Sequence, residues 1–204
     1  MSETDQNNPV AIITGASSGI GMGVARKLGL DGASVVINYH SHPEPAEELA
    51  SEIRGNGGRA ITVGADVSSE DEVAKLFDAA CEAFGRVDIL VANSGAQKDA
   101  AIADMTLEQW RAVIDLDLTG QFLCCREAVR RFRKQDAEGR PFRAKGVIVS
   151  MTSVHDAIPW AGHINYAAAK CGARMFVETL AQEVSGEGIR VNAVAPAFVR
   201  TPLT

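Results

Sequence analysis

Two residues, Tyr166 and Lys170, have the types and the spacing needed for proton transfer. They stand four positions apart in Tyr166-Ala-Ala-Ala-Lys170, so on a helix the phenol and the ammonium lie one turn apart on one face. A buried ammonium favours the phenolate form of a neighbouring phenol, which can then work as an acid or a base. Pairs with this spacing also occur on solvated helix surfaces, so the motif alone leaves both interpretations open.

Ser153 supplies a third polar group, thirteen residues before Tyr166. It follows the apolar run at residues 147–149, and its hydroxyl could hydrogen-bond a reacting oxygen. His155, Trp160 and Gln97 are predicted to face the same crevice or its rim. We expect His155 and Gln97 to contact a substrate; the alternative is that His155 and Trp160 only shape the wall.

A glycine-rich turn follows the first apolar run, Val10–Ile13. It reads Thr-Gly-Ala-Ser-Ser-Gly-Ile-Gly over residues 14–21, and a helix-like stretch comes next. A strand, a glycine-rich turn and a helix form the layout that receives a pyrophosphate, because the helix N-terminus offers free N–H groups. The spacing is G-x-x-x-G-x-G, and no Lys-Ser/Thr follows, which excludes a P-loop. The alternative is a glycine-rich loop without a ligand.

Apolar runs alternate with helical patterns along the whole chain. Strands are predicted near residues 10–14, 34–39, 60–64, 88–92, 146–151 and 190–195. Helices are predicted near residues 19–30, 44–55, 69–84, 106–134 and 163–185. This alternation predicts an α/β fold with a doubly wound parallel sheet of the Rossmann type. We expect one domain over residues 9–204, after a disordered N-terminus at residues 1–8.

Composition narrows the classes of partner. The net charge of −6 and the pI of about 5.3 argue against nucleic acid. No apolar stretch reaches the ~18 residues that a membrane span needs. The cysteines are Cys81, Cys124, Cys125 and Cys171. Neither they nor the histidines have metal-ligand spacing, so we predict no metal and a reduced, cytoplasmic protein.

These motifs together resemble the classical short-chain dehydrogenases/reductases. The glycine turn, Asn93-Ser94-Gly95 after the fourth predicted strand, Ser153 and the Tyr-x-x-x-Lys pair follow the family's order and separations over residues 8–204. The segments 114–120 and 153–160 resemble those of the glucose 1-dehydrogenase branch. The resemblance implies an oxidoreductase that uses NAD or NADP.

The resemblance also implies roles for individual residues. Tyr166 would exchange a proton with the substrate oxygen, Lys170 would assist Tyr166 and hold the nicotinamide ribose, and Ser153 would orient the substrate oxygen. The implied cofactor-binding residues are Gly15, Ser17, Ser18, Gly19, Ile20, Gly21, Tyr39, His40, Asp66, Val67, Asn93, Gly95, Tyr166, Lys170, Pro196 and Thr201. Asp66 would meet the adenine; the alternative is that it caps the following helix, and the two roles are compatible.

The second predicted strand ends in Asn38-Tyr39-His40-Ser41, without the carboxylate that NAD sites usually place there. We therefore expect NADP, or use of both NADP and NAD.

Two features depart from the family's pattern. Asp117 stands where the family usually has an asparagine of the active site. We keep it with the catalytic group, although its carboxylate could pair with Lys170 and weaken the effect of Lys170 on Tyr166. The chain also ends at Thr204, where the resemblance implies a substrate lid and a last strand, so both are expected to be absent.

The expected reaction moves a hydride between a hydroxyl-bearing carbon, or its carbonyl, and nicotinamide. An aldose such as glucose, oxidised at its anomeric hydroxyl, is the first choice of substrate. Reduction of a ketone or a 3-oxoacyl group is the second, and a truncated cofactor-binding protein without turnover is an alternative of another class. The family further implies a homodimer or homotetramer that packs through the helix near 106–134.

Overall fold

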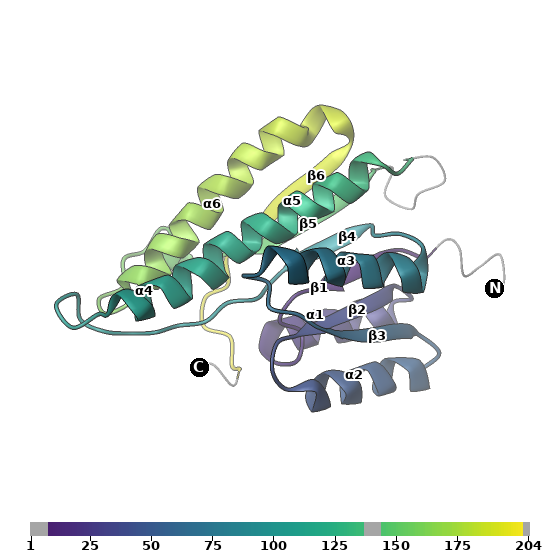
Figure 1. Cartoon of the computed structure of the whole chain (residues 1–204), viewed down its shortest axis with the longest axis horizontal. Coiled ribbons are helices and arrows are strands. Elements are labelled where there is room, and N and C mark those ends of the chain that lie inside the picture. Colours follow the sequence, from purple (N-terminus) through teal and green to yellow (C-terminus); the bar gives the residue numbers. More distant parts are fainter. Residues whose placement is uncertain (1–7, 137–143, 202–204) are drawn as a thin grey trace.

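A computed structural model describes residues 8–136 and 144–201 as one parallel sheet with helices on both faces (Figure 1). The strands are β1 (Val10–Ile13), β2 (Ser34–Tyr39), β3 (Arg59–Gly64), β4 (Ile89–Ala92), β5 (Gly146–Met151) and β6 (Ile189–Val194). The main helices are α1 (Gly19–Leu30), α2 (Pro43–Gly55), α3 (Glu70–Phe84), α4 (Leu107–Ile114), α5 (Gly120–Arg133) and α6 (Ile164–Val184). The predicted α/β class is confirmed.

The strand order β3-β2-β1-β4-β5-β6 confirms the doubly wound topology. Every pairing is parallel, including β1 with β2 and β1 with β4. The chain builds outward from β1 to β3, then returns and builds outward from β4 to β6. The carboxyl ends of β1 and β4 therefore lie side by side where the order reverses, which is where such sheets bind ligands.

Two hydrophobic layers hold the helices to the sheet. On one face, Ile12 of β1 and Ile148 of β5 share a buried cluster with Phe77 of α3 and Phe132 of α5. On the other face, strand residues pack with helix residues of α1 and α2. These include Ile13, Ile37, Ala25, Leu49 and Ile53. Both faces of the central strands β1, β2 and β4 are covered, which explains why these strands are nearly continuous apolar runs. In β6, by contrast, only Ile189 and Val191 are buried.

The helix predicted near 106–134 is present as α4 and α5, joined by a π-helical turn at Asp115–Thr119. Thr106 begins it with a capping box: its hydroxyl accepts from the Gln109 N–H at 3.1 Å, and the Gln109 side chain accepts from the Thr106 N–H at 2.9 Å. The π-helical turn widens the helix by one residue. Within that turn the side chain of Asp117 is fully buried.

Two predictions about the termini are not tested by the fold. The predicted disordered segment at residues 1–8 lies, apart from Asn8, outside the described residues. The expected absence of a lid and a last strand stays a prediction. In the described ranges 8–136 and 144–201, no helix has the length and apolar character needed to cross a membrane.

Gly146 gives the first testable consequence of this packing. A Cβ at Gly146 would lie 2.2 Å from Cδ2 of Phe132, whose ring is fully buried and cannot move away freely. We expect Gly146→Ala to lower the free energy of unfolding by about 1–3 kcal/mol, measured by urea denaturation, because overpacking strains a core.

Gly23→Ala is the matched control. Gly23 lies in α1 with no foreign atom within 4 Å of an added Cβ, so this change should be neutral or raise stability by up to about 1 kcal/mol. Equal stability of the two variants would contradict the packing of Phe132 on Gly146.

Candidate active site

A cavity of about 1140 Å³ lies at the carboxyl ends of the strands. It extends from His40 and Asp66, past the glycine turn, to Tyr166 and Lys170. The predicted site residues that line it are Gly15, Ser17, Ser18, Gly19, Ile20, His40, Asp66, Val67, Asn93, Gly95, Gln97, Asp117, Ser153, His155, Tyr166, Lys170, Pro196 and Thr201. The structure thus brings together residues predicted from one end of the chain to the other.

Gly21 and Tyr39 were predicted to bind the cofactor, but neither lines this cavity. Gly21 is buried in the first turn of α1, where an added Cβ would lie 2.5 Å from Nδ2 of Asn93 and 2.6 Å from the carbonyl oxygen of Gly15. The Tyr39 ring instead packs over Gly64, at 3.2 Å from the place of a Cβ there. Gly21 therefore allows close packing behind the glycine turn.

Asn38 holds the glycine turn, and sequence reasoning missed it. Its buried side chain accepts from the Gly15 N–H at 3.1 Å and donates to the carbonyl oxygen of Ala65 at 3.0 Å. The available signal was an asparagine at the end of the apolar run at residues 35–37. A polar group in a buried strand needs hydrogen-bond partners, and here those partners are the backbone groups that shape the cavity.

The N-terminus of α1 fits a pyrophosphate. Gly15 and Gly19 have φ values of 60° and 54°, in the left-handed region that favours glycine. Ser18 is the N-cap residue, yet its side chain makes no capping hydrogen bond. The Ser18 side chain thus leaves the N–H groups that begin α1 uncapped at the edge of the cavity, with the positive end of the helix dipole behind them.

Asp66 and His40 form the far end of the cavity. The Asp66 carboxylate accepts from Ser68, at 2.9 Å from the backbone N–H and 2.7 Å from the hydroxyl. Nε2 of His40 lies 3.9 Å from the other carboxylate oxygen. Partial burial opposes ionisation, but the Ser68 hydrogen bonds and His40 outweigh it, so the pKa of Asp66 is below its usual value. Ser69 is the N-cap of α3, so the alternative role of Asp66 as the helix cap is wrong.

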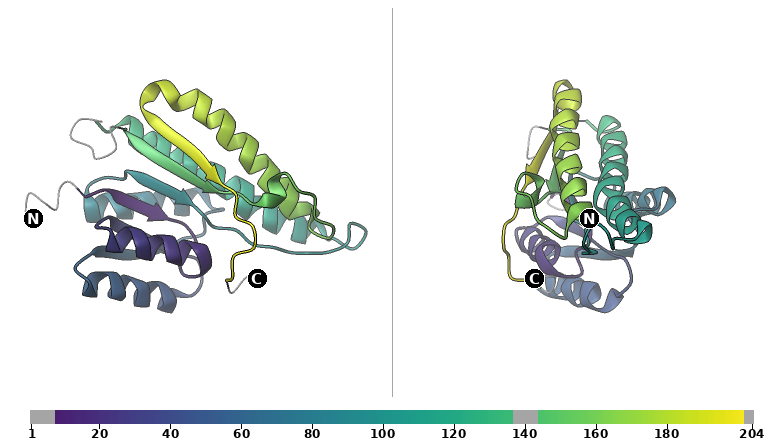
Figure 2. Two further views of the ribbon diagram at one scale, coloured as in Figure 1. Left: turned by 180° about the vertical axis from the view of Figure 1, so that it is seen from behind. Right: turned by 90° about the vertical axis from the view of Figure 1, so that its left-hand side faces the viewer.

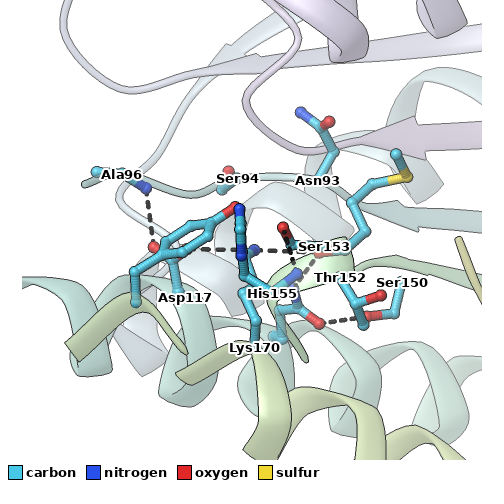
Figure 3. A network of polar contacts seen from close by, with 12 residues as sticks. Asn93, Ser94, Ala96, Asp117, Ser150, Thr152, Ser153, His155 and Lys170 are labelled. Atoms are coloured by element: carbon cyan, nitrogen blue, oxygen red, sulfur yellow. Dashed lines mark hydrogen bonds and ion pairs between the residues drawn. The ribbon is translucent and has the colours of Figure 1, made fainter. Parts of the chain in front are cut away.

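Ser153, Tyr166 and Lys170 meet at the opposite end. Ser153 follows β5 and is 6% exposed, and its hydroxyl accepts from the His155 N–H at 3.2 Å. Lys170, on α6, is 3% exposed and donates from Nζ to the carbonyl oxygen of Met151 at 3.1 Å. That Nζ lies 5.5 Å from the centre of the Tyr166 ring. Figure 3 shows Lys170 and Ser153 converging from α6 and from the end of β5.

Asp117 enters this group from the π-helical turn. One carboxylate oxygen accepts from the Ala96 N–H at 2.8 Å, and the other lies 3.2 Å from Nζ of Lys170 (Figure 3). Burial raises the pKa of the Asp117 carboxyl above its usual value, and the charge of Lys170 and the Ala96 N–H oppose this shift only in part. The carboxylate and the ammonium form a buried ion pair.

A stack of three rings forms one wall beside Ser153. The Trp160 ring lies between those of His155, at 4.3 Å, and His163, at 3.5 Å between centres. Nε2 of His163 is 3.2 Å from Asp99. Nδ1 of His155 lies 3.0 Å from the Ile158 carbonyl oxygen, which only accepts hydrogen bonds, so Nδ1 carries the hydrogen and Nε2 is left for other contacts. His163 and Asp99 were not predicted, and no local motif joins them.

The segment after β6 returns to the glycine turn. Pro196 accepts from the Val154 N–H at 3.0 Å, and a Cβ on Gly19 would lie 3.6 Å from Cβ of Thr201. Figure 2 shows this yellow segment running from the end of β6 toward the C-terminal end. In the ranges 8–136 and 144–201, no group of three or more His, Cys, Asp or Glu side chains could hold a metal ion.

Comparison with known proteins agrees with this geometry. The family model described as short chain dehydrogenase matches residues 9–204. The chain belongs to the short-chain dehydrogenase/reductase family. It is therefore a member of a family of oxidoreductases that use NAD or NADP, which confirms the predicted enzyme class.

Three curated relatives carry different substrates in their names. The chain is 42% identical to 3beta-hydroxysteroid dehydrogenase 1 of Eggerthella lenta, over 98% of this chain and 74% of the relative. It is 40% identical to glucose 1-dehydrogenase 2 of Bacillus subtilis, over 97% and 74%. It is 42% identical to a 3-oxoacyl-[acyl-carrier-protein] reductase of Synechocystis sp., over 96% and 76%. The family is confirmed, but the glucose 1-dehydrogenase branch is not singled out.

A solved structure confirms the fold. The crystal structure of a short-chain type dehydrogenase/reductase from Mycobacterium marinum superposes with a TM-score of 0.88 at 32% identity. The match covers 98% of this chain and 76% of that one. The chain thus spans about three-quarters of the length of these proteins.

Gly21 provides a test of how the glycine turn is held. In Gly21→Ala the new Cβ would press on Asn93 and on the Gly15 carbonyl, and the backbone cannot yield as a flexible side chain would. We expect dinucleotide binding, followed by fluorescence titration, to weaken by about tenfold or more, equivalent to at least ~1.4 kcal/mol. Gly23→Ala, two residues along the same helix, should bind as the parent does. Unchanged affinity in Gly21→Ala would show that the turn does not depend on this packing.

Proposed function

We propose that this protein is an NAD(P)-dependent oxidoreductase that moves a hydride between a hydroxyl-bearing carbon, or its carbonyl, and nicotinamide. The observation that carries the proposal is the convergence of Ser153, Tyr166 and Lys170 on the cavity that also contains the glycine turn. A binding protein without turnover would need the turn but not this second group of side chains.

The cofactor supplies the hydride chemistry when it is bound. The chain would hold its pyrophosphate at the residues of the glycine turn, its adenosine near Asp66 and Val67, and its nicotinamide half near Lys170 and Thr201. The start of α1, where the Ser18 side chain makes no cap, supports the first assignment. The lining of the cavity by all of these residues supports the others.

Tyr166 is the proposed acid and base. In oxidation it takes the proton of the substrate hydroxyl, and in reduction it returns a proton to the carbonyl oxygen. Lys170, buried beside the ring, supplies the positive charge that favours the phenolate. The Ser153 hydroxyl donates a hydrogen bond to the substrate oxygen, and this bond strengthens as charge develops there.

An aldose oxidised at its anomeric hydroxyl is the proposed substrate. A sugar presents several hydroxyls, and the cavity offers Nε2 of His155 and the amide of Gln97 near Ser153. A ketone or a 3-oxoacyl group, reduced in the opposite direction, is the second candidate. The 42% identity to the 3-oxoacyl reductase favours it.

We further propose NADP, or both NADP and NAD, as cofactor. The segment that follows β2 brings His40, Ser41 and His42 to the cavity, and these side chains donate hydrogen bonds without repelling a 2′-phosphate. Assembly as a homodimer or homotetramer is likewise a proposal. Exposed apolar side chains along α4, α5 and α6 support it: Leu107, Phe122, Ile164 and Met175.

The first experiment follows reduced-nicotinamide absorbance with NAD or NADP and a panel of aldoses, secondary alcohols and a 3-hydroxysteroid. Oxidation of reduced cofactor by 3-oxoacyl thioesters and ketones is followed in parallel. We expect glucose to give turnover, with a rate for NADP at least equal to that for NAD. Turnover of only the steroid or the thioester would reject the aldose, and binding of cofactor without turnover of any compound would reject the enzyme.

Tyr166→Phe tests the acid–base role. Removal of the phenol hydroxyl should lower kcat by a factor of about 10²–10⁴ or more, which abolishes measurable turnover. The affinity for the dinucleotide should stay within a few fold of the parent. Stopped assays measure the first quantity and fluorescence titration the second. Normal turnover by the variant would show that another group moves the proton.

A further inference from the structure

Asp117 places a carboxylate against the lysine of the proposed active site. Its side chain has no exposed surface, and one of its oxygens lies 3.2 Å from Nζ of Lys170. The other oxygen accepts from the Ala96 N–H at 2.8 Å. Gly95 is required beside it, because a Cβ there would lie 2.8 Å from the oxygen that faces Lys170. This contact is built into the site and is not a chance surface pair.

Few other charges act at this position. From α6, Lys170 faces Asp117 and lies beside the Tyr166 ring, and β5 contributes the neutral Met151 carbonyl that accepts from Lys170. The loop after β4 contributes only backbone at Gly95 and Ala96. Asp115, two residues earlier on the same turn, is exposed, so it points away from the site. Within the described residues, Lys170 is the charged group whose field acts on Asp117.

We propose that Asp117 is a positioning residue that holds Lys170 in place and, by its negative charge, sets the pH range in which Tyr166 exchanges its proton. This inference deepens the proposed function and rests on it for the role of Tyr166. Lys170 favours the phenolate because it is positive. Asp117 offsets part of that charge at short range, where little water screens the interaction.

The direction of the effect follows from the signs of the charges. Asp117→Asn keeps the shape of the side chain and an oxygen for the Ala96 N–H, but removes the negative charge. The field of Lys170 at the phenol is then no longer offset, so Tyr166 should ionise at lower pH. At an effective dielectric of ~20, removal of a unit charge about 12 Å from the phenol corresponds to a shift of about one pH unit, and a shorter separation corresponds to a larger shift.

The direct test is a near-ultraviolet titration of the phenolate, which needs no substrate. The chain has only two tyrosines, so Tyr39→Phe leaves Tyr166 as the single signal. In that background we expect Asp117→Asn to lower the pH of half-ionisation by about one unit. Asp115→Asn removes the same charge from an exposed position on the same turn. This control should leave the pH of half-ionisation of Tyr166 unchanged.

The kinetic test uses the substrate found with the panel. The acid limb of kcat/KM for alcohol oxidation should move to lower pH in Asp117→Asn by the same amount, and should stay unmoved in Asp115→Asn. A purely structural role for Asp117 would change the size of kcat/KM without moving the limb.

The two tests separate this inference from the proposed function. An unmoved titration in a folded Asp117→Asn protein overturns the inference even if the parent turns over glucose. If Asp117→Asn lowers the pH of half-ionisation of Tyr166 but the parent turns over no compound, the role of Asp117 is supported and the proposed reaction is rejected. If Asp117→Asn does not fold, judged by circular dichroism, Asp117→Ser also keeps an oxygen acceptor without the charge and is read in the same way.

Discussion

Thr14 and the end of β4 form the junction on which the binding site depends. The Thr14 hydroxyl oxygen accepts from the backbone N–H groups of Asn93, at 2.9 Å, and Ser94, at 3.0 Å. The Asn93 amide returns a hydrogen bond to the Thr14 carbonyl oxygen at 2.9 Å. These bonds close the gap between β1 and β4, where strand order reverses and main-chain pairing ends. They place the glycine turn at that gap, so the start of α1 points into the cavity rather than over the sheet.

At the end of the cavity that contains Ser153, Tyr166 and Lys170, the structure has to keep the positive charge of Lys170 buried. Lys170 is almost fully enclosed, and an ammonium without partners would be costly there. The Met151 carbonyl of β5 and the Asp117 carboxylate of the π-helical turn are the partners that stabilise the ammonium. Removing a partner from a buried ion pair generally costs more than the pair itself contributes. The position of Lys170 beside Tyr166 thus depends on elements from three distant parts of the chain.

Sequence patterns predicted the features that arise from local spacing. The apolar runs mark the central strands because both sheet faces are covered there, and the four-residue interval of Tyr166 and Lys170 marks one helical face. Features made by contacts between distant segments were not predictable. Asn38 binds Gly15 and Ala65, which are 23 and 27 residues away. The π-helical turn has no sequence signature, and the placement of Asp66 was ambiguous because Ser68 and Ser69 both follow it.

The same division explains why the reaction class is easier to infer than the substrate. Tyr166 and Lys170 share one helix, and the strand end before Ser153 is held by the sheet, so their relative positions follow from regular structure. The wall beside Ser153 is made by the stacked rings of His155, Trp160 and His163, in the segment between β5 and the start of α6. Its shape depends on contacts such as that of His163 with Asp99, so a single change in either loop can alter it. A wall that can vary on a constant scaffold fits the three relatives, whose names give a 3beta-hydroxysteroid, glucose and a 3-oxoacyl group.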